Sequence, residues 1–174
     1  MTHHEPPPSR RFLELATSPA RDLQAEMRRG RAPDRAKLAG QELRGVNTAG
    51  GLRLAGADRF VKGFTGDGGY NRRVRRGPRT GRWLPADGPE PKPFAFFSVD
   101  AVDPEATDNR YLDALLLDYG PHARSALDPA GRLRDYLVAL DADHTLLLGH
   151  AFVALGRRRI PATFFVLEPL RPAP

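Results

Sequence analysis

Five ionisable side chains of this 174-residue chain share a strand face with large apolar neighbours, which makes them the residues best placed for chemistry. Successive side chains of a β-strand point to opposite faces, so residues two apart lie on the same face. A charge that faces a core is costly unless it is paired or hydrogen-bonded. The five residues, with their apolar neighbours, are Lys62 (Phe60, Phe64), Asp118 (Leu112, Leu116), Arg134 (Tyr136, Val138), His150 (Leu148, Phe152) and Glu168 (Phe164, Val166).

A buried polar group of this kind has two interpretations, and the residues leave both open. It is either an internal salt-bridge network that fixes strand register or the lining of a ligand site. The flanking phenylalanines require burial of Lys62, and Asp118 offers the complementary charge. Arg134 and Glu168 stand at strand ends, where a charge can reach water. We therefore expect Lys62 to face the protein interior, within ion-pair or hydrogen-bond range of Asp118, His150 or Glu168.

The elements that must position these residues are mainly β-strands. Beyond Gly40 the apolar pattern alternates, and glycine, proline and aspartate interrupt it at the spacing typical of an all-β sandwich or barrel. The loops between the last three strands are too short for a parallel crossover, so these strands form antiparallel hairpins. The predicted strands are Glu42–Asn47, Arg59–Phe64, Tyr70–Val74, Gly81–Leu84, Phe94–Val102, Tyr111–Tyr119, Leu133–Asp141, Thr145–Leu155 and Arg158–Glu168.

Closure into an antiparallel up-and-down β-barrel of about 8 to 10 strands is the predicted architecture, with a two-layer sandwich as the alternative. Closure removes the exposed sheet edges, and a barrel of about eight strands can enclose a small ligand. We expect the strand face that carries the bulky residues of the last strands, including Leu148, Phe152 and Phe164, to fill the barrel interior. The predicted organisation is a disordered tail over residues 1–11, an N-terminal helical segment over 12–40 and a barrel domain over 41–170.

Composition narrows the class of protein further. With no cysteine, the chain has no disulfide, thiolate metal site or cysteine nucleophile, and we expect a cytoplasmic protein without a membrane span. The net charge of +6 is unevenly distributed, because residues 1–84 carry +10 and the remainder −4. Arginine supplies 24 of the 27 basic residues without an aromatic-rich binding motif, so a nucleic-acid partner is not expected.

Several short strings resemble the ordered blocks of a family of microbial proteins with no assigned activity, whose pattern is similar to calycin-type, lipocalin-like barrels. The resemblance covers about residues 42–168, and it rests on LRGVNTAGGLRLAGADRFVKGF, GYNR, LLLDYG, LRDYLVALD, LLLGHAFVALG and FFVLE. In the Leu-Gly-x block, where the family has lysine, this chain has His150, a departure that affects any shared chemistry that requires an amine there. The positions that the resemblance matches are Lys62, Asn71, Asp118, Tyr119, Arg134, Asp135, His150 and Glu168.

These observations predict a barrel that binds a small amphipathic organic ligand without a cofactor or metal. His150 and Asp118 are the candidate proton donor or acceptor if the protein is a cofactor-free isomerase or cyclase. The candidate ligand-binding residues are Lys62, Asn71, Tyr119, Arg134, Glu168 and the single tryptophan, Trp83. Two alternatives remain: an anion- or nucleic-acid-binding module that uses the loop from Arg72 to Arg82, and a structural interaction domain. The ligand, the existence of a reaction and the oligomeric state stay open.

Overall fold

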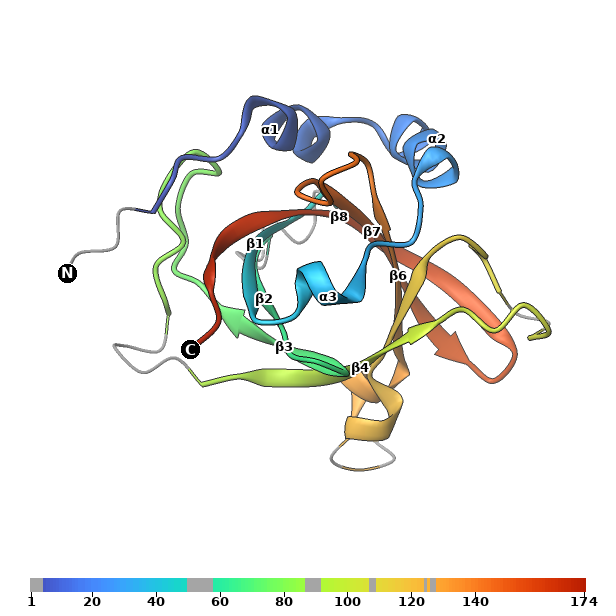
Figure 1. The fold of residues 1–174 in the computed structure, drawn as a ribbon. Coiled ribbons are helices and arrows are strands. Elements are labelled where there is room, and N and C mark those ends of the chain that lie inside the picture. Colours follow the sequence, from blue (N-terminus) through green and yellow to red (C-terminus); the bar gives the residue numbers. More distant parts are fainter. Residues whose placement is uncertain (1–4, 50–57, 87–91, 107–108, 124, 126–127) are drawn as a thin grey trace.

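Eight antiparallel strands close into a β-barrel in the computed structural model, which describes residues 5–49, 58–86, 92–106, 109–123, 125 and 128–174. Each strand pairs with its successor, and β8 pairs with β1 to complete the ring (Figure 1). The predicted mainly β, up-and-down barrel is therefore confirmed. The strands are β1 Gln41–Asn47, β2 Arg59–Phe64, β3 Gly68–Arg73, β4 Phe94–Ala101, β5 Leu115–Asp118, β6 Leu133–Ala139, β7 Leu147–Leu155 and β8 Arg158–Pro172.

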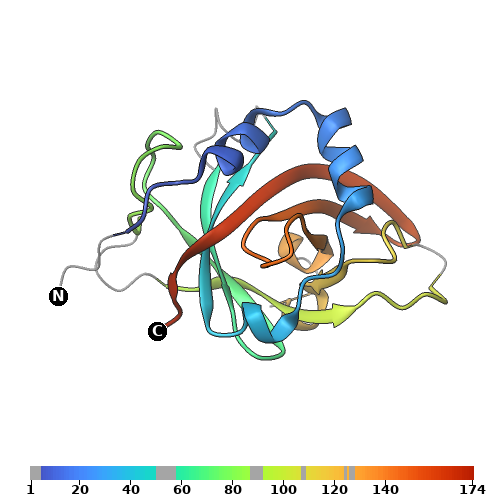
Figure 2. The same cartoon turned by 45° about the horizontal axis from the view of Figure 1, so that its top comes forward.

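Three α-helices precede the barrel: α1 Arg10–Thr17, α2 Ala20–Arg29 and α3 Arg35–Leu38. The side chains of Ser9 and Asp34 cap α1 and α3 by accepting backbone N–H bonds, as short polar residues do at helix starts. Helices α1 and α2 lie against the outside of the barrel wall, whereas α3 lies across one barrel opening (Figures 1 and 2). Two short 3-10 helices, η1 Gly120–His122 and η2 Pro129–Arg132, connect β5 to β6.

The molecule has two apolar cores that the barrel wall separates. The inner core fills the barrel end beneath α3, and it joins Leu38 of α3 to Leu43, Phe64, Phe97 and Leu117. The outer core lies between the wall and the N-terminal helices, and it includes Phe12, Leu15, Leu23, Met27, Tyr136, Val138, Leu148, Phe152, Phe164 and Val166. Both faces of β6, β7 and β8 are therefore buried, one inside the barrel and one beneath the helices.

The prediction that the bulky side chains of the last strands face the barrel interior is wrong. Leu148, Phe152 and Phe164 belong to the outer core, and the small residues Gly149 and Ala151 face inward. The physical reason is that a helix-covered outer wall buries large apolar side chains as well as an interior does. A Cβ atom added at Gly149 would overlap the Phe165 ring, so this inward-facing position has no room for a larger residue.

Two strand predictions also differ from the structure. Residues 81–84 form no strand. The fully buried Trp83 of this segment packs on the outer wall, and Val74 and Pro85 form an isolated bridge nearby. The predicted strand over 111–119 shortens to β5, since Tyr111 packs instead beside Tyr136 on the outer wall.

Residues 5–11, which the sequence places in a disordered tail, lie against the barrel wall. The Glu5 carboxylate accepts from the Trp83 backbone N–H at 2.7 Å, the Pro6 carbonyl accepts from Arg44 at 2.6 Å, and α1 already begins at Arg10. These bonds to buried partners offset the lack of regular structure in the proline-rich segment. Residues 1–4 lie outside the described residues. Within the part of the chain that the structure describes, no helix has the length and apolar character needed to cross a membrane.

Candidate functional site

The barrel contains a cavity of about 590 Å³ that adjoins the inner core, since Tyr119, Ala151 and Phe165 belong to both. Apolar side chains supply most of its lining, among them Phe60, Phe94 and Phe165. The polar part of the lining includes Lys62, Asn71, Tyr119 and Asp135 from four different strands or their ends. A mostly apolar cavity with a few convergent polar groups is the usual form of a small-molecule site.

Lys62, Tyr119 and Asp135 form a buried hydrogen-bonded triad, with only 2%, 3% and 4% of each residue exposed. The Lys62 ammonium donates to the Tyr119 hydroxyl over 2.6 Å and lies 3.4 Å from Oδ2 of Asp135. The Tyr119 hydroxyl in turn donates to the same Oδ2 over 2.9 Å. A continuous path for a proton therefore links the amine, the phenol and the carboxylate.

Strand pairing explains why these three residues meet. Alternation on β2 points Phe60, Lys62 and Phe64 inward, as their sequence spacing predicts. On β6 the same rule points Asp135 inward between Leu133 and Leu137, and Tyr119 follows the inward-facing Leu117 of β5. The ammonium also lies 4.6 Å from the Phe97 ring centre and 5.3 Å from that of Phe165, so cation–π attraction helps hold a charge there.

Asn71 completes the polar group and connects it to an unusual backbone position. Its amide donates to the Ala95 carbonyl over 2.9 Å and lies 3.5 Å from the Tyr119 hydroxyl oxygen. Ala95 has φ of 45°, a left-handed conformation that costs a residue with a Cβ atom about 1 to 2 kcal/mol. Strained backbone of this kind tends to persist where it serves a site.

Burial dominates the electrostatics of the triad. It lowers the pKa of Lys62, against the opposing charge of Asp135, and it raises the pKa of Asp135, against the opposing charge of Lys62. Burial, followed by the Asp135 charge, holds the pKa of Tyr119 well above its usual value of about 10. Tyr119 is therefore a neutral donor at pH 7, and the amine and the carboxylate are drawn toward the pKa range of acid–base catalysts.

One atom of the triad stands out chemically. Among the described residues, Oδ1 of Asp135 is buried and has no hydrogen-bond partner. Leaving a buried acceptor unsatisfied costs about 1 to 3 kcal/mol, and more if it is charged. A hydrogen-bond donor in the cavity, or a proton on the carboxylate, would remove this cost.

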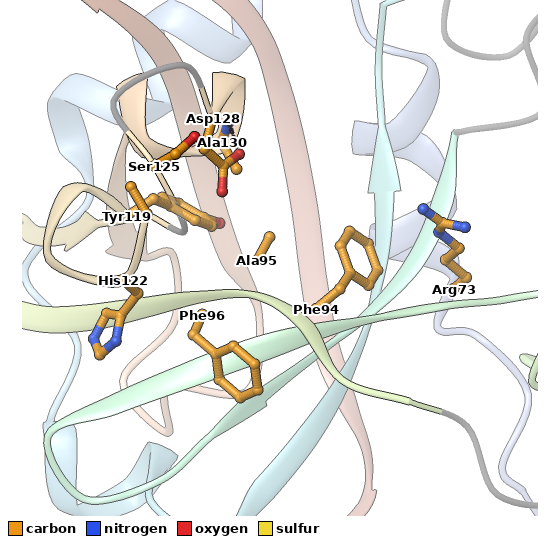
Figure 3. Close-up of a pocket in the computed structure, with 10 residues that line it drawn as sticks. Arg73, Phe94, Ala95, Phe96, Tyr119, His122, Ser125, Asp128 and Ala130 are labelled. Carbon is orange, nitrogen blue, oxygen red and sulfur yellow. Dashed lines mark hydrogen bonds between the residues drawn. The ribbon is translucent and has the colours of Figure 1, made fainter.

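A second hollow of about 440 Å³ adjoins the cavity, and the two share Arg73, Phe94, Ala95 and Tyr119. Figure 3 shows the Tyr119 side chain in this hollow, with Ser125 and Asp128 on one side and Phe94 and Arg73 on the other. Arg73 is exposed, and its guanidinium lies 5.2 Å from the Phe94 ring centre. A cationic group therefore stands at the rim of the apolar cavity.

The other residues that the sequence singles out lie on the outer face of the wall. Asp118 pairs with Arg134 at 2.9 Å, and His150 approaches the Tyr111 hydroxyl at 2.7 Å. Glu168 lies 3.4 Å from Arg44 and accepts the Ser9 backbone N–H. Trp83 lies beneath Phe12 and the Arg59 guanidinium. The expected pairing of Lys62 with Asp118, His150 or Glu168 is thus replaced by pairing with Asp135 and Tyr119.

Asp135 is the cavity residue that the alternation argument misses, although the resemblance matches it. Its neighbours at i−2 and i+2 are Leu133 and Leu137, the same kind of signal that identifies Lys62. Tyr136 and Val138, on the opposite face of β6, are bulkier, so the sequence favours their face as the interior one, whereas both residues lie in the outer core.

The arginines between 72 and 82 are partly engaged within the protein. Arg72 lies 3.0 Å from the buried Glu42 carboxylate. Arg79 donates to the backbone carbonyls of Ala16 and Asn47, which ties the loop to α1 and β1. These two side chains therefore have structural roles.

Among the described residues, no three His, Asp or Glu side chains gather closely enough to hold a metal ion. Comparison of the chain with models of protein families, with curated proteins and with solved structures finds no match.

Proposed function

We propose that this barrel, calycin-like in its architecture, binds a small amphipathic organic molecule in the cavity that Lys62, Tyr119 and Asp135 line. The observation that carries the proposal is the buried Oδ1 of Asp135, which has no hydrogen-bond partner among the described residues and lies beside a buried lysine in a mostly apolar wall. A purely structural ion pair would be expected to satisfy both carboxylate oxygens, because leaving one unsatisfied is costly.

The cavity also indicates what kind of molecule would fit. Its volume of about 590 Å³ lies within the range of about 300 to 1,000 Å³ of typical ligand pockets. Phe60 and Phe165 would contact an apolar body, and the triad would bind a hydroxyl or carbonyl group. Arg73 at the rim would attract a carboxylate at the other end of the molecule.

We further propose that the triad supports proton transfer, as in a cofactor-free isomerase or cyclase. Oδ1 of Asp135 would remove a proton from the carbon next to a ligand carbonyl, and the electron pair would move to the carbonyl oxygen as an enolate. The Lys62 ammonium would stabilise that oxygen, and return of the proton to a different carbon would complete an isomerisation. Asp135 and Lys62 take these roles in place of His150 and Asp118, which face away from the cavity.

Binding is tested by titration with 1-anilinonaphthalene-8-sulfonate, an amphipathic fluorescent probe. Ala151→Phe places a ring in the cavity. Ala154→Phe makes the same exchange on the opposite face of the same strand, because alternation puts Ala154 on the face of Phe152. We expect saturable binding to the wild type and to the Ala154 variant, and at least a tenfold loss in the Ala151 variant. Equal affinity in all three proteins would contradict the proposal.

Proton transfer is tested by deuterium uptake into 2-tetralone, an enolisable bicyclic ketone, followed by proton NMR in D₂O. Asp135→Asn removes the proposed base, and Glu168→Gln is the matched change on the outer wall. We expect exchange above the buffer rate in the wild type and the Glu168 variant, and loss of that excess in the Asp135 variant. Exchange at the buffer rate in the wild type would refute the acid–base role and leave the binding proposal standing.

A further inference from the structure

A separate pocket of about 350 Å³ lies on the outer wall, between α2, the segment before β5 and the β7–β8 hairpin. His150 and Phe152 of β7 line it, whereas Ala151 between them lines the interior cavity. The barrel wall therefore separates the two spaces, and the outer pocket is independent of the proposed interior site.

A chain of hydrogen bonds fixes the polarity of the pocket floor. The Gln24 amide donates to the Tyr111 hydroxyl over 2.7 Å, so the hydroxyl hydrogen is available to His150 Nδ1, also at 2.7 Å. Burial lowers the pKa of His150 to about 4, which leaves the imidazole neutral at pH 7. With Nδ1 as the acceptor, the ring carries its hydrogen on Nε2 as a donor. Stacking on Phe164, with ring centres 3.9 Å apart, holds the ring in place.

Three guanidinium groups, those of Arg28, Arg110 and Arg159, line the same pocket, and its described lining includes no carboxylate. In the described part of the chain, no ion pair joins Arg28 or Arg110 to an acidic side chain. Arg110 is positioned by a hydrogen bond to the Arg159 carbonyl and by the Phe152 ring at 6.0 Å. Arg159 also donates to the Gly156 carbonyl over 3.1 Å. Arg28 and Arg110 place positive charge on the lining of one pocket, so an anion bound there would be attracted to both.

We propose that this outer pocket binds a small molecule bearing a multiply charged oxyanion, either a phosphate or a polycarboxylate. Guanidinium groups match the geometry of both kinds of oxygen, and the Tyr111–His150 pair adds neutral hydrogen-bonding groups beside them. The pocket volume limits the ligand to a small molecule. Phe152 and Pro161 would contact its apolar part.

The test measures binding of pyrophosphate and of citrate by calorimetry at constant ionic strength, with His150 ring signals followed by NMR. Arg110→Gln removes one guanidinium from the pocket, and Arg21→Gln is the control on an exposed turn of α2, where Arg21 contacts Asp22. We expect saturable binding of at least one anion, a His150 shift, at least a fivefold loss in the Arg110 variant and less than a twofold change in the Arg21 variant.

Tighter binding of pyrophosphate would assign a phosphorylated ligand, and tighter binding of citrate a polycarboxylate. Absence of saturable binding of either anion would overturn the proposal. It would also be overturned by equal losses in the two variants, because these would indicate a general effect of net charge. Neither result would bear on the interior cavity, which lies across the wall.

Discussion

Replacement of Lys62 by methionine is the perturbation whose energetic effect follows most directly from the structure. Methionine keeps a similar length but removes the ammonium that hydrogen-bonds to Tyr119 and pairs with Asp135. Removal of one partner from a buried ion pair costs about 3 to 5 kcal/mol when the other charge is left behind. Asp135 can limit this cost by keeping a proton, since burial already raises its pKa.

The cost of Lys62→Met should therefore depend on pH. Without Lys62, folded Asp135 holds a proton above the pH at which the unfolded carboxyl, with a pKa of about 3.9, has lost it. The folded state then binds more protons than the unfolded state, so its stability falls as pH rises, by up to about 1.4 kcal/mol per pH unit. The fall ends where the folded carboxyl has lost its proton, and the whole loss is then the cost of stranding the charge, about 3 to 5 kcal/mol.

Urea unfolding of the wild type and the variant at several values between pH 4.5 and 8 measures this effect. We expect a small stability difference at pH 4.5 that grows to about 3 kcal/mol or more at pH 8, and we expect Lys62→Met/Asp135→Asn to remove the pH dependence. A difference that is constant with pH, or below about 1 kcal/mol throughout, would refute the reasoning that a buried charge pair controls this position.

Three further outcomes are expected. Tyr119→Phe removes hydrogen bonds to Lys62 and Asp135 and should lower the free energy of unfolding by about 1 to 3 kcal/mol in urea, whereas an unchanged midpoint would contradict the triad geometry. The His150 ring should titrate near pH 4 when followed by NMR, and titration near pH 6.5 would disprove its burial. Because the folded pKa lies below the unfolded one, the contribution of neutral His150 to stability is complete above about pH 6.5 and is lost as the pH falls toward 4. Trp83→Ala should cost about 3 to 5 kcal/mol by circular dichroism in urea, since Trp83 is fully buried against Phe12, and a cost below about 1 kcal/mol would show that the outer core does not hold the N-terminal segment.

Much of the barrel could be predicted because its signals are local. The short connections between β6, β7 and β8 permit only antiparallel hairpins. The predicted bounds of β2, Arg59–Phe64, are the observed ones. Closure could be anticipated because an open sheet would leave unpaired edges. The inward orientation of Lys62 could also be predicted, because phenylalanines flank it at both i−2 and i+2.

The placement of His150 and Asp118 could not be predicted from the same rule. Alternation separates the two faces of a strand, but it does not say which face is inside when both are buried. On β7, packing of α2 buries the face of His150, while Gly149 and Ala151 line the inside. That decision depends on contacts between segments more than 100 residues apart, which strand periodicity does not contain.

The pairing of Lys62 with Asp135 depends on the same long-range information. Register places Asp118 opposite Arg134, and therefore Tyr119 and Asp135 near one another on the inner face. The sequence contains several carboxylates that could satisfy a buried lysine, and the register of three strands selects one of them. Asp135 is consequently the part of the site that the structure adds.

Contacts between a bound probe and the cavity wall test the central proposal most directly. In protein with isotope-labelled alanine methyl groups, 1-anilinonaphthalene-8-sulfonate should give intermolecular nuclear Overhauser effects to Ala95 and Ala151, which line the cavity, and none to Ala154 on the outer face. Such a pattern would place the ligand beside Lys62 and Asp135. Contacts to Ala154 with none to Ala151 would contradict the account and remove the cavity as the binding site.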